Sequence, residues 1–131
     1  MIQKTKRSIK WVKPIERPTK YAGVLLAADF WFGRIIEEPK EIKRILITAA
    51  KKAKNIPLEV TIHKFSPQGL TGVVLLAESH IFISTWPEIN YVAIDIFTCG
   101  EKAFPYKALD YLKKEFKPKK VKINEIKRGL M

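Results

Sequence analysis

Four strand-like segments follow one another in the middle of the chain, and the connections between them are too short to hold a helix. They cover residues 58–64, 71–77, 80–86 and 91–98, and each has the alternating or continuous apolar pattern of a β-strand. Antiparallel strands can be joined by tight turns, whereas parallel strands need a crossover of about a dozen residues or more. The chain is therefore constrained to form a largely antiparallel sheet.

Two amphipathic segments and two further strands complete the predicted fold. Residues 37–54 and 105–116 place apolar side chains along one helical face, and residues 21–30 and 119–126 have the pattern of strands. The order is strand–helix–strand–strand, then strand–strand–helix–strand. Two such helices can cover one face of a sheet. We expect an α+β fold, a two-layer sandwich in which two helices cover one face of a mostly antiparallel sheet.

The basic character of the chain is concentrated in two places. The net charge of +12 comes from residues 1–20, with seven Lys or Arg against one Glu, and from residues 113–128, with eight against two. A basic patch can bind phosphate backbones, so a nucleic-acid-binding module is one interpretation. No nucleic-acid-binding motif accompanies the charge, and we expect no nucleic-acid partner. We interpret residues 1–20 as a basic N-terminal arm and residues 21–131 as one domain.

Other features of the sequence exclude several classes of protein. The longest apolar runs, such as residues 73–77, are too short to span a bilayer, and the basic N-terminus is not followed by the apolar stretch of a signal peptide. We expect a cytoplasmic protein with no membrane partner. Cys99 is the single cysteine, and neither His63 nor His80 has ligand spacing with it. We therefore expect no disulfide and no metal site.

Three short motifs occupy neighbouring predicted strands and the turns beside them. They read Glu78-Ser79-His80, Ser84-Thr85-Trp86-Pro87-Glu88 and Phe97-Thr98-Cys99-Gly100, and they follow His63-Lys64-Phe65, Pro67 and Gly69. In this pattern the chain closely resembles the bacterial and archaeal type of S-adenosylmethionine decarboxylase. The resemblance covers roughly residues 20–130 and is most specific over residues 63–114.

The resemblance implies that the chain is made as a proenzyme and cuts itself between Glu78 and Ser79. The hydroxyl of Ser79 would attack the carbonyl carbon of Glu78, and elimination would leave a covalent pyruvoyl cofactor in place of Ser79. Thr71 and His80 would assist this processing. The pyruvoyl ketone can form a Schiff base with the substrate amine and accept the electrons left when carbon dioxide departs.

The resemblance also implies a substrate, S-adenosylmethionine, and a product that donates an aminopropyl group in spermidine and other polyamine synthesis. Cys99 would be the catalytic proton donor. Phe65 and Trp86 would line the adenosyl pocket, since aromatic rings suit a cationic sulfonium nucleoside. Glu88 would accept hydrogen bonds from the ribose. We expect a symmetric homo-oligomer, at least a dimer of cleaved protomers, with active sites near the interface.

One position departs from this pattern, because family members usually carry His where this chain has Ser84. That His is assigned to proton transfer during processing, and a serine hydroxyl has no comparable basicity. Ser84 can still hold a hydrogen bond and remains a candidate catalytic residue. Three interpretations stay open. His80 or His63 supplies the base, or the chain is a paralogue acting on arginine or ornithine, or the chain stays uncleaved and inactive.

Overall fold

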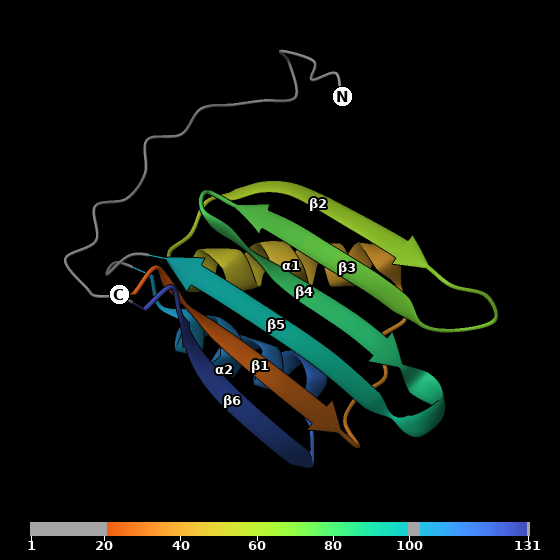
Figure 1. The fold of residues 1–131 in the computed structure, drawn as a ribbon. Coiled ribbons are helices and arrows are strands. Elements are labelled where there is room, and N and C mark those ends of the chain that lie inside the picture. Colours follow the sequence, from red (N-terminus) through yellow and green to blue (C-terminus); the bar gives the residue numbers. More distant parts are fainter. Residues whose placement is uncertain (1–20, 100–102, 131) are drawn as a thin grey trace, which may run out of the picture.

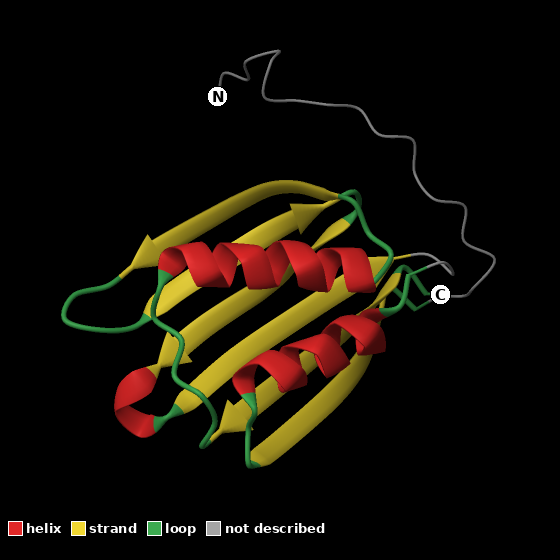
Figure 2. Ribbon diagram, turned by 180° about the vertical axis from the view of Figure 1, so that it is seen from behind, coloured by secondary structure: helices red, strands yellow, loops and turns green. Residues whose placement is uncertain are grey.

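The computed structural model describes residues 21–99 and 103–130 (Figure 1). The expected basic arm over residues 1–20 and Gly100, the last residue of the third motif, lie outside the described residues. The described part is a six-stranded sheet with two helices packed against one of its faces (Figure 2). The predicted α+β two-layer sandwich is confirmed.

The secondary-structure elements follow the predicted order. They are β1 (Gly23–Trp31), α1 (Pro39–Lys52), β2 (Pro57–Lys64), β3 (Leu70–Leu76), β4 (Ser79–Trp86), the 3-10 helix η2 (Pro87–Ile89), β5 (Tyr91–Cys99), α2 (Pro105–Phe116) and β6 (Lys120–Arg128). The sheet order is β2-β3-β4-β5-β1-β6, and every neighbouring pair is antiparallel. The short connections from β2 to β5 thus form successive hairpins, as tight turns favour.

The first strand of the chain is inserted between the last two. β1 pairs with β5 on one side and with β6 on the other. Strands from before and after the β3–β4 turn therefore share one sheet in an interleaved order (Figure 1). A break of the backbone in that turn would leave each half of the chain paired with the other along β3–β4, β1–β5 and β1–β6.

The face of the sheet turned toward the helices carries the hydrophobic core. Along β4 and β5, buried residues alternate with more exposed ones, as expected when one face of a strand is covered. Fully burying one large apolar side chain contributes about 1.5–3 kcal/mol. The core includes Leu26, Phe30, Ile81, Ile83, Ile94 and Ile96 from the sheet, and Ile42, Ile45, Leu46, Leu109, Leu112 and Phe116 from the helices.

Within the described residues, neither helix covers the opposite face of the sheet, which we call the open face (Figure 2). It is formed by the strand residues that alternate with the core residues. Most of the predicted site residues fall on it. They are Thr71 on β3, His80, Ser84 and Trp86 on β4, and Cys99 on β5.

Helix α1 begins two residues later than the predicted range of 37–54. Glu38 is its N-cap, and its carboxylate accepts a hydrogen bond from the Lys40 backbone N–H at 3.4 Å. Pro39 takes the first helical position, where its missing N–H costs nothing. Glu37 is thereby left outside the helix, and its carboxylate contacts the sheet instead.

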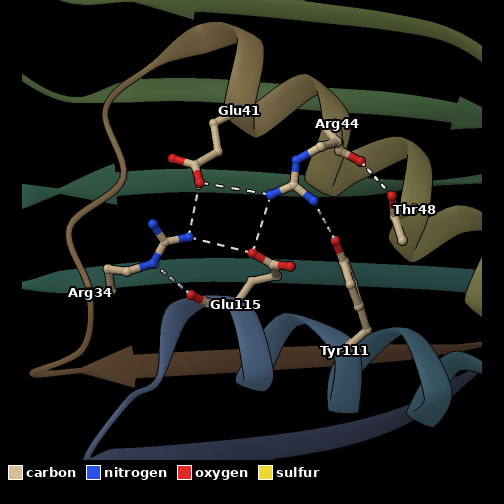
Figure 3. Close-up of polar contacts among 6 residues, drawn as sticks. All are labelled: Arg34, Glu41, Arg44, Thr48, Tyr111 and Glu115. Carbon is tan, nitrogen blue, oxygen red and sulfur yellow. Dashed lines mark hydrogen bonds and ion pairs between the residues drawn. The ribbon is translucent and has the colours of Figure 1, made fainter.

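An ion-pair network joins α1, α2 and the connection between β1 and α1 (Figure 3). Arg34 lies 3.0 Å from the Glu41 carboxylate and 3.4 Å from that of Glu115, and Arg44 contacts the same two carboxylates at 3.7 and 3.3 Å. Arg44 also donates to the Tyr111 hydroxyl at 3.3 Å. Exposed pairs of this kind contribute about 0–1 kcal/mol each. The network therefore orients the helices more than it stabilises them.

Candidate active site

Ser79 and Cys99 form a close contact at one end of the sheet. Ser79 is the first residue of β4 and Cys99 the last of β5, and the Ser79 Oγ lies 3.1 Å from the Cys99 Sγ. The register partner of Ser79 is Thr98, so the Ser79 side chain contacts Cys99, the residue that follows its partner on β5. Both side chains are half-buried. The structure brings together two of the predicted catalytic residues, although twenty positions separate them along the chain.

The backbone at the expected cleavage point is strained. Only Ala77 and Glu78 connect β3 to β4, and φ is 77° at Glu78 and 137° at Ser79. L-residues other than glycine rarely adopt such angles, and each instance costs on the order of 1–3 kcal/mol. Two consecutive residues thus hold strain on either side of one peptide bond, directly beside the Cys99 thiol.

Gly23 on β1 makes room for the end of β5. It is paired with Cys99, and a Cβ added to Gly23 would lie 2.5 Å from the Thr98 carbonyl oxygen and 3.2 Å from the Cys99 Sγ. A side chain at this position would therefore displace the strand that carries the thiol. Sequence reasoning did not select Gly23, although a glycine within a strand often marks a close approach of this kind.

Thr71 and Ser84 form a second contact, well away from the first. They are register partners on β3 and β4, and their hydroxyl oxygens lie 3.2 Å apart. Ser84 follows Ser79 by five residues on the same strand, which at ~3.3 Å per residue is about 16 Å. Within one chain, the structure does not bring this hydroxyl pair to Ser79.

The two histidines occupy different parts of the open face. His80, next to Ser79, has its ring 5.6 Å from that of Phe82 and 5.8 Å from that of Phe97. His63 lies on β2 as the register partner of Thr71, with its ring 4.5 Å from the Phe65 ring in an edge-on arrangement. His80 is therefore placed beside the Ser79–Cys99 contact, and His63 beside the Thr71–Ser84 contact.

The predicted substrate-binding residues lie at the end of β4 remote from Ser79. Trp86 is the last residue of β4, and Glu88 lies in η2, a 3-10 helix that forms the predicted turn at residues 87–90. Phe65 follows β2 and is about half exposed, at 50%. Trp86 lies seven residues, or about 23 Å, from Ser79 along the strand. These residues gather with the Thr71–Ser84 pair and not with the Ser79–Cys99 pair.

An aromatic row crosses the open face at this same end. The Tyr91 ring lies between those of Trp86 and Trp31, with centroid distances of 5.4 and 5.5 Å. The Tyr91 hydroxyl donates a hydrogen bond to the Asp29 carboxylate. Burial, followed by this hydrogen bond, raises the pKa of Tyr91 to about 12. Sequence reasoning selected Trp86 alone, because neither the pairing of β1 with β5 nor the Asp29 contact follows from local pattern.

Glu37 anchors the loop between β2 and β3. Its carboxylate accepts a hydrogen bond from the Gly69 N–H at 2.8 Å and another from the Thr85 hydroxyl at 3.0 Å. Thr85 Oγ1 in turn accepts one from the Leu70 N–H at 3.0 Å. Gly69 has a φ of 94°, which suits glycine. This network fixes the loop that carries Phe65 against the end of β4, and sequence analysis had assigned Glu37 to the helix.

Residues 21–99 and 103–130 contain no group of three or more His, Cys, Asp or Glu side chains that could hold a metal ion. They also contain no helix with the length and apolar character needed to cross a membrane.

Comparison with known proteins identifies the class to which this fold and site belong. The family described as S-adenosylmethionine decarboxylase matches residues 25–129. The crystal structure of the adenosylmethionine decarboxylase from Aquifex aeolicus VF5 has a TM-score of 0.79 and 35% sequence identity, covering 86% of this chain and 95% of that one.

Individual relatives agree with this class. The S-adenosylmethionine decarboxylase proenzyme of Clostridium kluyveri is 45% identical over 98 residues, which are 75% of this chain and 78% of that protein. The protein of the same name from Pyrococcus furiosus is 47% identical over 96 residues, or 73% of this chain and 69% of its own length. The chain belongs to the S-adenosylmethionine decarboxylase family.

Proposed function

We propose that this chain is a self-processing proenzyme whose mature form decarboxylates S-adenosylmethionine. The observation that carries the proposal is the 3.1 Å contact between Ser79 Oγ and Cys99 Sγ beside the strained Glu78–Ser79 backbone. The relatives that match the chain are named as proenzymes of this decarboxylase. The names of these relatives favour S-adenosylmethionine as the substrate over arginine or ornithine.

Glu78 and Ser79 would supply the groups that cut the backbone. The Ser79 hydroxyl attacks the carbonyl carbon of Glu78, the C–N bond breaks, and an ester replaces the peptide bond. Loss of the Cα proton of Ser79 then expels the Glu78 carboxylate, and water converts the dehydroalanine to a pyruvoyl group with release of ammonia. Breaking the chain here releases the strain of the two positive φ angles.

A pyruvoyl group at position 79 would supply the electron sink that no natural side chain provides. Position 79 fits such a group, because the side chain at this position already lies against the Cys99 thiol. Cys99 would hold a proton close to the carbon that loses carbon dioxide and donate it there. Gly23 would keep that space open from the β1 side. The decarboxylated product is a donor of aminopropyl groups for spermidine and other polyamines.

The nucleoside part of the substrate would bind at the other end of the strands. Trp86 and Phe65 are exposed to 42% and 50%, so both rings can accept a stacked base or a sulfonium cation. Glu88 would accept hydrogen bonds from the ribose hydroxyls. The short carbon–sulfur chain between the amino acid and the ribose cannot bridge the ~23 Å that separates Trp86 from Ser79 along β4.

We infer that a second copy completes the site, so that the enzyme is a homodimer joined through its open faces. Exposed Leu75, Phe82, Trp86 and Ile126 give this face an apolar character. Six strands of this length present a face on the order of 700 Å², comparable to the ~800 Å² that each partner buries in a standard interface. A two-fold axis would bring Trp86, Thr71 and Ser84 of one copy toward Ser79 of the other.

Release of carbon dioxide from carboxyl-labelled substrates tests the proposal. The purified protein should release it from S-adenosylmethionine, and far more slowly from arginine and ornithine. The Ser79→Ala variant, which cannot form the ester, sets the baseline. The Lys43→Ala variant, changed at an exposed position of α1 on the other face of the sheet, should match the parent chain. Release that is no faster than from Ser79→Ala, or a preference for arginine or ornithine, would overturn the proposal.

A further inference from the structure

Three polar side chains lie in one row across the first three strands of the sheet. His63 on β2 is the register partner of Thr71 on β3, and Thr71 is the register partner of Ser84 on β4. Side chains directly opposite one another on antiparallel strands have Cβ atoms about 4.5–5.5 Å apart, within reach of a hydrogen bond. The Thr71 and Ser84 hydroxyls already make such a contact at 3.2 Å.

The chemistry of hydroxyl groups limits what this row can do. A hydroxyl can donate and accept at once, so it can pass a proton along, but it has no basicity near neutral pH. The Thr71–Ser84 pair can therefore remove a proton from a reacting group only if the row ends on a base. The residue at its end is His63, and imidazole is the side chain whose ordinary titration lies near neutral pH.

We propose that His63 is the base for self-cleavage and acts through Thr71 and Ser84. The inference rests on the proposed function, because a base is needed to remove the Cα proton of Ser79. That proton passes to Ser84 Oγ as the Ser84 proton passes to Thr71 Oγ1 and the Thr71 proton to a ring nitrogen of His63. The C–H electrons form the Cα=Cβ bond, and the ester C–O bond breaks to release the Glu78 carboxylate.

The surroundings of His63 suit this role. The Phe65 ring contacts it edge-on and restricts its rotation. β3, the strand paired with β2, contains no titratable side chain along Leu70–Leu76, and α1 packs on the other face of the sheet. The titratable side chains that accompany it are therefore Glu59 and Lys64 of its own strand, and His80 farther along the open face. Because the row lies about 16 Å from Ser79 of its own chain, it serves Ser79 of the second copy.

The rate of cleavage of freshly made full-length chain, followed by intact mass across a range of pH, tests this proposal. His63→Ala should slow cleavage roughly 100-fold, remove the increase in rate with pH near neutrality, and be partly rescued by added imidazole. His63 is exposed on an edge strand, so the variant should remain folded. The control is Lys43→Ala, at an exposed position of α1 on the other face of the sheet, which should cleave like the parent.

A second variant separates a base from a merely structural residue. Ser84→His places an imidazole at the far end of the row, so His63→Ala should have little effect in that background. If the double variant remains as slow as His63→Ala, His63 has a structural role and the proposal is wrong. The proposal is also wrong if the cleavage rate of His63→Ala still rises with pH, or if that rise is lost in His80→Ala instead. In either case the proposed function stands. A parent chain that never cleaves overturns both.

Discussion

The Ser79 hydroxyl lies 3.1 Å from the Cys99 thiol, at the point where β4 begins and β5 ends. The two residues would act in different steps, one in self-cleavage and the other in decarboxylation. Ser79 would become the cofactor, whereas Cys99 would act on the substrate bound to it. This contact therefore allows processing and decarboxylation to be separated by substitution.

Replacing Cys99 by Ala should impair decarboxylation more than cleavage. The variant retains the Ser79 hydroxyl and the strained backbone, but it lacks the proton donor, and loss of a general acid typically lowers the rate about 10²–10⁴-fold. Intact mass would report cleavage, and carbon dioxide release from S-adenosylmethionine would report turnover. A cleaved Cys99→Ala variant with the parent's turnover would exclude Cys99 as the donor.

Replacing Gly23 by Ala should also lower activity, although Gly23 bears no functional group. The new Cβ would lie 2.5 Å from the Thr98 carbonyl oxygen, so β5 must shift and carry Cys99 away from Ser79. We expect a decrease in kcat of roughly tenfold or more, since small misplacements of reacting groups are costly. Ala22→Ser, at the exposed preceding position, is the control. Equal kcat values for all three proteins would show that the close approach is not needed.

The Tyr91–Asp29 hydrogen bond should make stability fall at alkaline pH. The pKa of Tyr91 is raised to about 12 in the folded chain, against about 10 for an ordinary tyrosine. Its contribution is therefore complete below about pH 10 and is lost as the pH rises through about 12. The free energy of unfolding of the parent should decrease more steeply over this interval than that of Tyr91→Phe. Parallel pH profiles would contradict the assignment.

Removing the Glu37 carboxylate should loosen the loop that carries Phe65. Glu37→Ala leaves the Gly69 N–H and the Thr85 hydroxyl without their acceptor, which should cost about 1–3 kcal/mol. We expect a lower free energy of unfolding and a higher KM, with kcat less affected. Asp110→Ala, at an exposed position of α2 on the other face of the sheet, controls for loss of a carboxylate. An unchanged KM would mean that the loop does not contribute to substrate binding.

The hairpins were predictable because their determinants are local. Alternation along residues 80–86 and the short turns on either side identify a strand and its neighbours without reference to distant residues. The placement of β1 between β5 and β6 joins segments about 60–105 residues apart, and no local pattern predicts it. Gly23, Asp29 and the Tyr91 contact depend on that placement.

The candidate site was predictable as a set of residues but not as an arrangement. Motif resemblance selected Ser79, Cys99, Thr71 and Ser84 without indicating which of them meet. The structure separates them into two pairs about 16 Å apart along β4, because a strand extends by ~3.3 Å per residue. The proposal that a second copy completes the site rests on this separation and not on any single motif.

The mass of the purified chain under denaturing conditions tests the central claim most directly. We predict two species, residues 1–78 and residues 79–131, the second beginning with a pyruvoyl group. Without denaturant they should elute together, because β1 of the first piece lies between β5 and β6 of the second. Ser79→Ala should give one intact mass. A parent chain that keeps the mass of all 131 residues after prolonged incubation would contradict the account.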